Sequence, residues 1–335
     1  MKKKPNPREM HLIDVGKATK GYSIPHPNGS SDVWMAPAFV DPPQYDNEED
    51  SPDKIENFVW DMNLVSKILI AWIMGMPLNI VGPPGSGKTE HIIQLAIIFN
   101  WELVVIECEE EMQKYQLLGR DVVKDDETAW ADAGVADAFR YGKILLLDEY
   151  HTLSGGLKRA LNRLSDINPR LNLSDNHNER LHCVEYFGLF ATSNCKDFGD
   201  IDGRNPDAAE NNTASANRFS VVEVDYQPED VEVDILVKSV PELANLDEST
   251  PLSMVQLGNM VRSSIQETSI PIDWSMRTLI QWAKWQLMLG DCADAFKTAF
   301  YSKLENLSHK SAVVEAYELV FEETLEELEA PDDLN

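Results

Sequence analysis

The stretch between residues 78 and 99 constrains this chain more than any other part of it. An apolar run at residues 78–81 is followed by a glycine-rich turn, and residues 88–99 then carry apolar side chains at helical spacing. The turn fits the pattern G-x-x-x-x-G-K-[ST] in full, with the residues Gly82, Pro83, Pro84, Gly85, Ser86, Gly87, Lys88 and Thr89. A strand, a glycine-rich loop and a helix in this order predict a phosphate-binding loop in an α/β fold.

Each residue type in this loop has a chemical reason. Glycines let backbone N–H groups turn inward around phosphate oxygens, and the following helix directs the positive end of its dipole at the same anion. We therefore expect Lys88 to reach the β- and γ-phosphates of ATP and the Thr89 hydroxyl to bind Mg²⁺. The alternative is a chance glycine-rich turn, which the flanking strand and helix disfavour.

A second apolar run, at residues 144–147, ends in the carboxylates Asp148 and Glu149. Downstream of a phosphate loop, the first acid is expected to orient hydrated Mg²⁺ and the second to polarise the attacking water. The alternative is a solvated strand end without a chemical role. Two adjacent acids favour hydrolysis over simple nucleotide sensing.

Three further polar residues are candidates for the same site. Asn194 ends another buried strand and is expected beside Glu149, although a turn-forming asparagine has the same signature. Arg218 precedes the fifth strand and is a candidate arginine finger for the ATP of a neighbouring subunit. Arg277 opens a helix and is expected to reach back to the γ-phosphate. For both arginines a surface salt bridge stays open as the alternative.

Strand and helix patterns alternate from residue 55 to residue 226, which predicts a doubly wound α/β domain around a parallel sheet. After that point only helical patterns occur, and they predict a smaller all-helical domain over 227–325. Residues 1–54 are expected to form an N-terminal arm and acidic linker, and 326–335 an acidic tail. The expected strands are 78–81, 103–106, 144–147, 188–192 and 220–224; the expected helices include 55–74, 88–99, 157–164, 230–240, 252–265, 276–289 and 312–328.

The overall charge narrows the classes of partner. Among 335 residues there are 29 Lys and Arg against 57 Asp and Glu, for a formal net charge of −28. An acidic chain gains nothing from releasing the counterions of DNA or RNA, so nucleic-acid binding by the whole surface is disfavoured. A local basic pore loop stays open.

Cysteine usage and apolar runs indicate the compartment. None of the four cysteines belongs to a C-x-x-C pair, so we expect reduced and mostly buried thiols. The basic start at residues 1–5 is not followed by an apolar segment, and the longest apolar stretch, 68–78, is too short to cross a bilayer. These features predict a cytoplasmic protein.

Together the motifs resemble the MoxR-type branch of AAA+ ATPases, and within it the CobS-type ATPase subunits of aerobic cobaltochelatase. The likeness covers about residues 35–325. It depends on the phosphate loop and on the segments 116–119, 147–150, 189–194, 199–203, 217–220, 275–278 and 282–283. The loop and the Asp-Glu pair are general to AAA+ proteins, while 190–219 and 275–278 are more particular to this subgroup.

The resemblance implies an ATP-dependent ring, typically a hexamer, and a partner with a von Willebrand factor A domain. It implies remodelling of a partner protein or, in the cobaltochelatase case, cobalt insertion into a corrinoid. The segment 116–119 corresponds to a piece of the helix-2 insert that faces the ring pore. A nucleic-acid motor and a non-catalytic ATP-binding scaffold are the other hypotheses. The net charge disfavours the former, and the set Lys88, Asp148 and Glu149 disfavours the latter.

Overall fold

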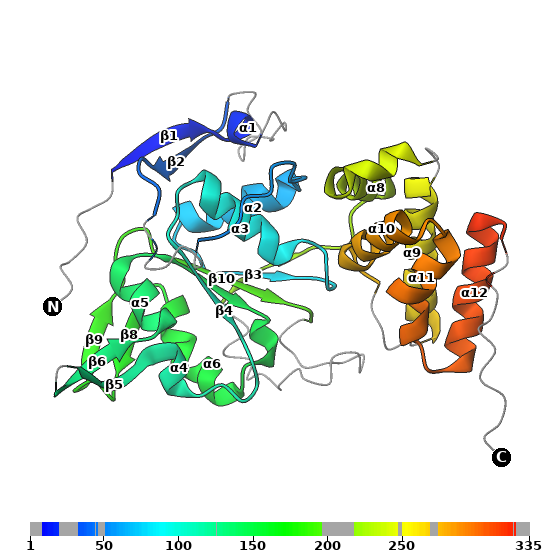
Figure 1. The fold of residues 1–335 in the computed structure, drawn as a ribbon. Helices are drawn as coiled ribbons and strands as arrows, with labels where there is room; N and C mark the ends of the chain where they lie inside the picture. The colour runs from blue at the N-terminus through cyan, green and yellow to red at the C-terminus, as the bar shows by residue number, and fades with distance from the viewer. Residues whose placement is uncertain are drawn as a thin grey trace, which may run out of the picture. The chain divides into compact units, whose positions relative to one another are not determined.

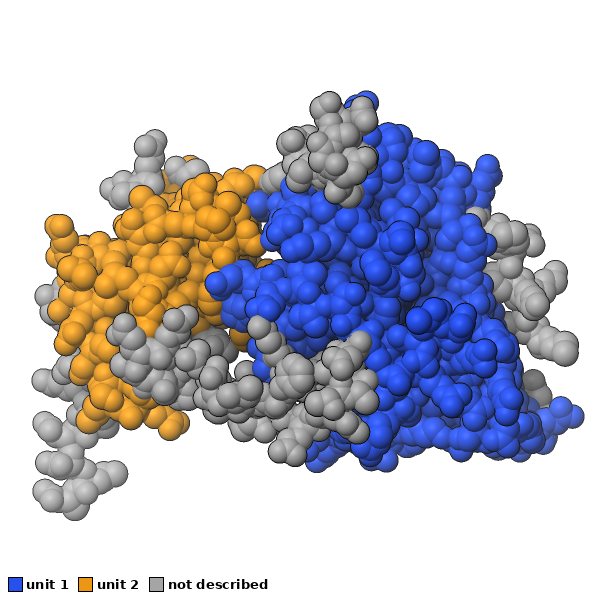
Figure 2. All heavy atoms as spheres, turned by 180° about the vertical axis from the view of Figure 1, so that it is seen from behind, with its two compact units in different colours: residues 1–83, 87–225 blue, residues 84–86, 226–335 orange. Residues whose placement is uncertain are grey.

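The computed structural model describes residues 9–19, 33–43, 45, 51–124, 126–195, 218–246, 250–268, 274–323 and 325. The chain divides into two compact units, one of residues 1–83 and 87–225 and the other of residues 84–86 and 226–335 (Figure 2). The acidic residues 46–50, the resemblance segment 199–203, Asn217 and the predicted tail 326–335 lie outside the described residues.

A parallel sheet forms the centre of the first unit (Figure 1). Its strands are β3 Leu78–Val81, β4 Leu103–Glu107, β7 Ile144–Asp148, β10 Gly188–Ser193 and β11 Ser220–Glu223. In space they run β11-β3-β10-β7-β4, and every neighbouring pair is parallel. Parallel neighbours require crossover connections, which helices supply here. The predicted parallel α/β fold is confirmed.

Both faces of this sheet are buried, so its strands read as unbroken apolar runs. In β7, Ile144 and Leu146 face one hydrophobic cluster, while Leu145 and Leu147 face another. This alternation follows from the two-residue period of a strand. Helices therefore cover the sheet on both sides, as a doubly wound fold requires.

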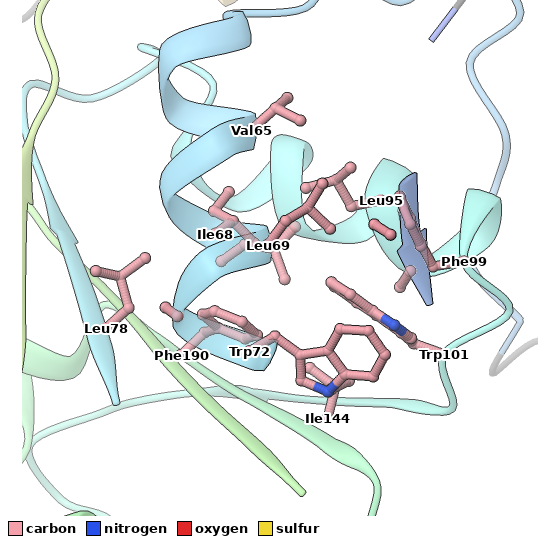
Figure 3. Close-up of a cluster of buried hydrophobic side chains, with 14 of the residues drawn as sticks. Val65, Ile68, Leu69, Trp72, Leu78, Leu95, Phe99, Trp101, Ile144 and Phe190 are labelled. Atoms are coloured by element: carbon pink, nitrogen blue, oxygen red, sulfur yellow. The ribbon is translucent and has the colours of Figure 1, made fainter. Parts of the chain in front are cut away.

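The first face is covered by α2 Met62–Ile73 and α3 Lys88–Ile98. Figure 3 shows Ile68, Leu69 and Trp72 of α2 packed toward the sheet and toward Trp101. The ring centroids of Trp72 and Trp101 are 4.6 Å apart. Because these large side chains are almost fully buried, they fix α3 on the sheet, and with it the loop that precedes α3.

The second face is covered by α5 Gly134–Tyr141 and α6 Gly155–Leu161, and a 3-10 turn, Asn162–Ser165, follows α6. Two antiparallel hairpins also lie on this side, one of β5 Gly119–Lys124 and β6 Glu127–Asp132, and one of β8 Arg170–Leu173 and β9 Glu179–His182. Arg140 of α5 donates to Asp132 and Glu179, one residue from each hairpin, at 2.6–3.1 Å. These bonds hold both hairpins to the same helix.

The N-terminal arm contains a small antiparallel ribbon, in which β1 Met10–Asp14 pairs with β2 Met35–Phe39. The short helix α1, Val15–Ala18, follows β1. Phe39 joins the first hydrophobic cluster, and its backbone N–H donates to Phe99 O at 3.1 Å. The arm therefore packs against the end of α3.

The second unit is helical. Its elements are α8 Glu229–Ser239, a 3-10 turn Pro241–Asn245, α9 Thr250–Thr268, α10 Met276–Leu289, α11 Cys292–Ala299, a 3-10 turn Tyr301–Lys303 and α12 Leu307–Phe321. Aromatic side chains fill its core, among them Trp274, Trp282, Phe296 and Tyr317. The predicted helical region after the sheet is confirmed. Nowhere in the described ranges is a helix both long and apolar enough to cross a bilayer.

Several predicted boundaries were wrong. The helix expected over 55–74 begins at Met62, because the Asp61 side chain accepts from the N–H groups of Asn63 and Leu64 and so caps it. The helix expected over 312–328 ends at Phe321, with Glu322 in a left-handed conformation. Neither hairpin was predicted; the strands β8 and β9 have only four residues each and lie in the polar stretch 165–187, so their alternation is too short to stand out.

Candidate functional site

The candidate residues of the first unit converge because three parallel strands end at one edge of the sheet. β3 leads into the glycine-rich loop, β7 ends at Asp148, and β10 is followed by Asn194. β10 lies between β3 and β7, so Asn194 follows a strand that is flanked by the strand leading into the loop and the strand ending in the Asp-Glu pair. In open parallel sheets this edge is where ligands bind.

Lys88 connects the loop with β10. It is the first residue of α3 and its side chain is buried, with 7% exposed. Its Nζ donates to the carbonyl oxygens of Gly82 and Pro83, both at 2.8 Å, and to Asn194 Oδ1 at 3.0 Å. A buried ammonium group inside the loop is placed to meet an anion that enters it, so the arrangement suits a phosphate chain. The sequence predicted Asn194 beside Glu149; in the structure the amide oxygen of Asn194 accepts from Lys88.

Thr89 and Asp148 meet directly, with Thr89 Oγ1 donating to Asp148 Oδ1 at 2.7 Å. Hydroxyl and carboxylate oxygens are the hard ligands that Mg²⁺ takes, and this ion commonly uses only one or two protein ligands besides phosphates and water. Among the described residues no three His, Cys, Asp or Glu side chains gather into a metal site. The donor set therefore fits Mg²⁺ held with a nucleotide rather than a closed protein cage.

Thr192 belongs to this site and was missed by sequence reasoning. Its hydroxyl donates to Asp148 Oδ1 and accepts from the Glu149 backbone N–H at 3.2 Å. It stands near the carboxyl end of a fully buried strand, where a hydroxyl needs a partner. In the sequence, the only indication was that Thr192 lies near the end of a strand expected to be buried.

The backbone of the loop is shaped for an anion. Gly85 and Gly87 have φ values of +73° and +81°, in the left-handed region that glycine adopts without strain. Gly87 is the N-cap of α3, and no side chain caps the helix there. The first N–H groups of α3 lie at the positive end of the helix dipole, which favours an anion.

Glu149 lies in a strained turn. Its φ and ψ are 53° and 38°, a left-handed conformation that costs a residue with a Cβ about 1–2 kcal/mol. Its carbonyl accepts from the hydroxyl and the N–H of Thr152, both at 2.9 Å. The carboxylate itself is exposed. Such strained residues cluster at active sites, where neighbouring contacts hold them in place.

Beneath this turn lies the buried Lys158, only 1% exposed, whose Nζ donates to His151 O at 2.9 Å. It also lies 5.2 Å from the centre of the Tyr150 ring. Burial, together with the negative charge of Asp148, raises the pKa of the nearby Cys108 thiol to about 12, against the opposing charge of Lys158. Cys108 is therefore a protonated thiol at neutral pH. It is buried, but Cys183 is exposed and Cys195 and Cys292 are half-buried, so the expectation of mostly buried thiols was wrong.

Arg218 has partners inside its own subunit. Its Nη1 donates to Asn162 O at 2.7 Å and to the Asp166 carboxylate. The salt bridge that the sequence left open as the alternative is thus present. Its action on a neighbouring ATP stays a prediction. Arg277 is exposed in the first turn of α10, in the second unit, and its role also stays a prediction.

In the segment expected to face a pore, α4 Lys114–Leu118 leads into β5. Leu117 and Leu118 are buried in the second hydrophobic cluster of the first unit. Lys114 pairs with Asp175 at 3.1 Å, and Arg120 lies 5.9 Å from the centre of the Tyr115 ring. The two leucines therefore contribute packing, whereas Gln116 of the same segment is exposed.

Comparisons with known proteins agree with this geometry. The AAA domain family (dynein-related subfamily) matches residues 77–209. The aerobic cobaltochelatase subunit CobS of Sinorhizobium sp. is 30% identical over 285 residues, which cover 83% of this chain and 85% of that protein. The denitrification regulatory protein NirQ of Pseudomonas aeruginosa is 28% identical, with 73% and 88% covered.

A solved structure of a RuvB variant from Thermotoga maritima aligns with a TM-score of 0.47 and 13% identity, covering 80% of this chain and 73% of that one. The extent of the match to CobS, together with the phosphate loop and the Asp-Glu strand end, identifies the family. The chain belongs to the AAA+ ATPases of the MoxR type, the branch to which its CobS and NirQ relatives belong.

Proposed function

We propose that this protein binds and hydrolyses Mg-ATP within an oligomeric ring, in the cytoplasm, and uses the energy to remodel a partner protein. The proposal rests on the bonds between the loop and the edge of the sheet. Lys88 bonds both the loop carbonyls and Asn194, and the adjacent Thr89 bonds Asp148. These contacts support a site for Mg-ATP at one edge of the sheet.

Each residue then has a role in the reaction. Lys88 and the N–H groups of the loop bind the phosphates, exchanging carbonyl and amide partners for phosphate oxygens. Thr89 and Asp148 would hold Mg²⁺, which would supply positive charge beside the phosphates. Glu149, exposed at the same edge, polarises the attacking water, and Asn194 orients that water or the γ-phosphate.

The first test removes the buried ammonium group. Lys88→Ala should abolish binding of a slowly hydrolysed ATP analogue, measured by titration calorimetry. Lys143→Ala is the matched control, because Lys143 is half-buried at the opposite end of β7, where it pairs with Glu102 and Asp137. The proposal fails if Lys88→Ala binds the analogue as tightly as the wild type does, or if Lys143→Ala loses binding equally.

The ring is proposed from the family and from Arg218. A cationic fork stabilises the charge that grows on a transferred phosphoryl group. For Arg218 to do this in the next subunit, it must leave Asp166. Light scattering with Mg²⁺ and the ATP analogue should show an oligomer, with a hexamer expected. Mixing Arg218→Ala with Lys88→Ala subunits should restore some turnover, since an intact loop can then meet an intact finger. A strict monomer at micromolar concentration would contradict the ring.

The partner is proposed to be a protein with a von Willebrand factor A domain. The net charge of −28 disfavours a nucleic-acid track, and Lys114, one of two cations flanking the insert, is already paired with Asp175. The second candidate is the ATPase role in cobaltochelatase, favoured by 30% identity to CobS over 83% of this chain.

These candidates separate in one set of ATPase assays at physiological salt. A co-encoded von Willebrand factor A protein should stimulate turnover several-fold, and DNA or RNA should not. Stimulation only by a corrinoid together with the remaining chelatase subunits would favour cobalt insertion. Stimulation by nucleic acid alone would replace both candidates with a motor that acts on DNA or RNA.

A further inference from the structure

His91 is a buried histidine that has no role in the proposed mechanism of ATP hydrolysis. It lies one turn into α3, with 3% of its surface exposed. Its Nδ1 is 2.7 Å from the carbonyl oxygen of Gly87, and its Nε2 is 2.9 Å from the backbone nitrogen of Asp61. The rings of Phe58 and Trp60 pack edge-on against it. The side chain thus bridges the phosphate loop and residues 53–61, which we call the strap.

The two contacts fix the protonation state of the ring. The Asp61 backbone N–H can only donate, so Nε2 must accept and carries no proton. Nδ1 must then carry the proton and donate to the Gly87 carbonyl. Burial lowers the pKa of His91, against the Gly87 bond and the Asp61 charge that raise it, which agrees with a neutral ring. His91 is therefore a directed bridge with one donor and one acceptor.

The bond to Gly87 has a consequence inside the loop. The peptide between Gly87 and Lys88 is planar and trans, so its N–H points away from its C=O. That carbonyl accepts from His91 twice, from Nδ1 at 2.7 Å and from the backbone N–H at 3.0 Å. Holding the carbonyl toward His91 turns the Lys88 N–H toward the open end of α3, where an anion would bind.

Gln94, one turn further along α3, provides a natural comparison. It is also buried and also holds the strap: its amide accepts from the Ile55 N–H at 3.0 Å and donates to Asp53 O at 2.8 Å. Its other contact is with Glu90, at 2.8 Å. Both side chains therefore tie the strap to α3, but Gln94 bonds to Asp53, Ile55 and Glu90, none of which belongs to the loop. Loss of Gln94 thus tests attachment of the strap alone, while loss of His91 removes a bond to the strap and a bond to Gly87.

We propose that His91 is a positioning residue for phosphate binding: it orients the Gly87–Lys88 peptide so that the Lys88 N–H points into the loop. The inference rests on the proposed nucleotide site and adds a residue to it. His91 acts through the backbone of Gly87, and its own ring does not touch the phosphate.

Two conservative substitutions separate the two bonds of the ring. His91→Asn keeps a donor near the position of Nδ1 and loses the acceptor for Asp61. His91→Gln keeps an acceptor near the position of Nε2 and loses the donor to Gly87. We expect His91→Gln to bind a slowly hydrolysed ATP analogue about threefold to tenfold more weakly, as for the loss of one hydrogen bond, while His91→Asn stays close to the wild type. Gln94→Met should leave the Kd unchanged.

Inorganic triphosphate is the second probe, since it has no base or ribose. The same fold-loss for triphosphate and for the ATP analogue would show that the effect arises at the phosphates. A loss confined to the ATP analogue, equal losses in His91→Asn and His91→Gln, or an equal loss in Gln94→Met would overturn the inference while leaving the proposed function intact. If the wild type binds neither probe, the proposed nucleotide site itself fails. Tm values measured without nucleotide verify that all variants are folded.

Discussion

The two units each bury a cationic side chain, but the partners of the two cations differ. In the second unit, Arg262 and Glu232 form an ion pair at 2.8 Å with side chains 7% and 3% exposed. Arg262 also donates to Trp274 O at 3.0 Å and lies 3.8 Å from the centre of the Tyr226 ring. These contacts join α8, α9 and the start of α10, so the charge is neutralised within the helical core.

In the first unit, by contrast, the buried ammonium group of Lys88 bonds to carbonyl and amide oxygens at the open edge of a sheet. Such neutral partners can be exchanged for phosphate oxygens, which bind a cation more strongly. A carboxylate partner as deeply buried as Glu232 could not be displaced without leaving an unpaired charge. For Lys88 and Arg262, the chemistry of the partner, more than burial, distinguishes a candidate ligand site from a structural pair.

The largest effect should come from the exposed carboxylate at that edge. Glu149→Gln removes the charge that we propose polarises water and keeps the size of the side chain, so kcat should fall by about 10²–10⁴ while the nucleotide Kd changes little. A coupled phosphate-release assay gives the rate, and calorimetry with the ATP analogue gives the Kd. Unchanged turnover would remove Glu149 from the mechanism.

Breaking the buried Arg262–Glu232 pair should lower stability and not catalytic rate. Arg262→Met leaves Glu232 buried without its partner, so we expect a loss of about 3–5 kcal/mol in the free energy of unfolding of the second unit. Adding Glu232→Leu should recover much of this loss, because the unpaired charge is then gone. Denaturant unfolding followed by tryptophan fluorescence measures both variants. A loss that the second substitution does not recover would mean that packing of the Arg262 side chain dominates.

The pH dependence of stability should be smaller and should come from the first unit. Because the pKa of His91 is lowered on folding from its ordinary value of 6.5, the unfolded chain takes up the proton first as pH falls. This contribution to stability is therefore fully present above pH 6.5 and declines below it, by at most about 1.4 kcal/mol per pH unit. His91→Gln should flatten that part of the curve; an identical slope in the variant would assign it to other groups.

The smallest effect should be a difference in alkylation between one buried thiol of each unit. Burial raises the pKa of Cys108 in the first unit to about 12 and that of Cys292 in the second to about 11. Neither thiol should be alkylated at pH 8 in the native protein. In Arg262→Met, Cys292 should react at a lower denaturant concentration than Cys108, as mass spectrometry of labelled peptides would report. Simultaneous labelling of both thiols would show that the units open together.

Much of the site followed from local patterns. The phosphate loop is a contiguous motif between a strand and a helix, and Asp148 and Glu149 end an apolar run, so their place at one sheet edge follows from the rule for parallel strands. The sequence did not indicate the contacts of Thr192 and His91. A threonine in an apolar strand, and a histidine in a helix, have the same sequence signature whether they pack silently or bridge two segments.

Local patterns in the sequence specified the five strands of the parallel sheet, the loop, and the polar residues at the carboxyl ends of β7 and β10, because strand and helix periods and glycine-rich turns are encoded locally. Contacts between distant groups became visible only in the folded protein: Lys88 with Asn194, His91 with Asp61, and Arg218 with Asp166. Such pairs form where packing brings separate segments together; for His91 and Asp61, α2 and α3 pack through the first hydrophobic cluster around Trp72 and Trp101. Sequence spacing does not specify that packing.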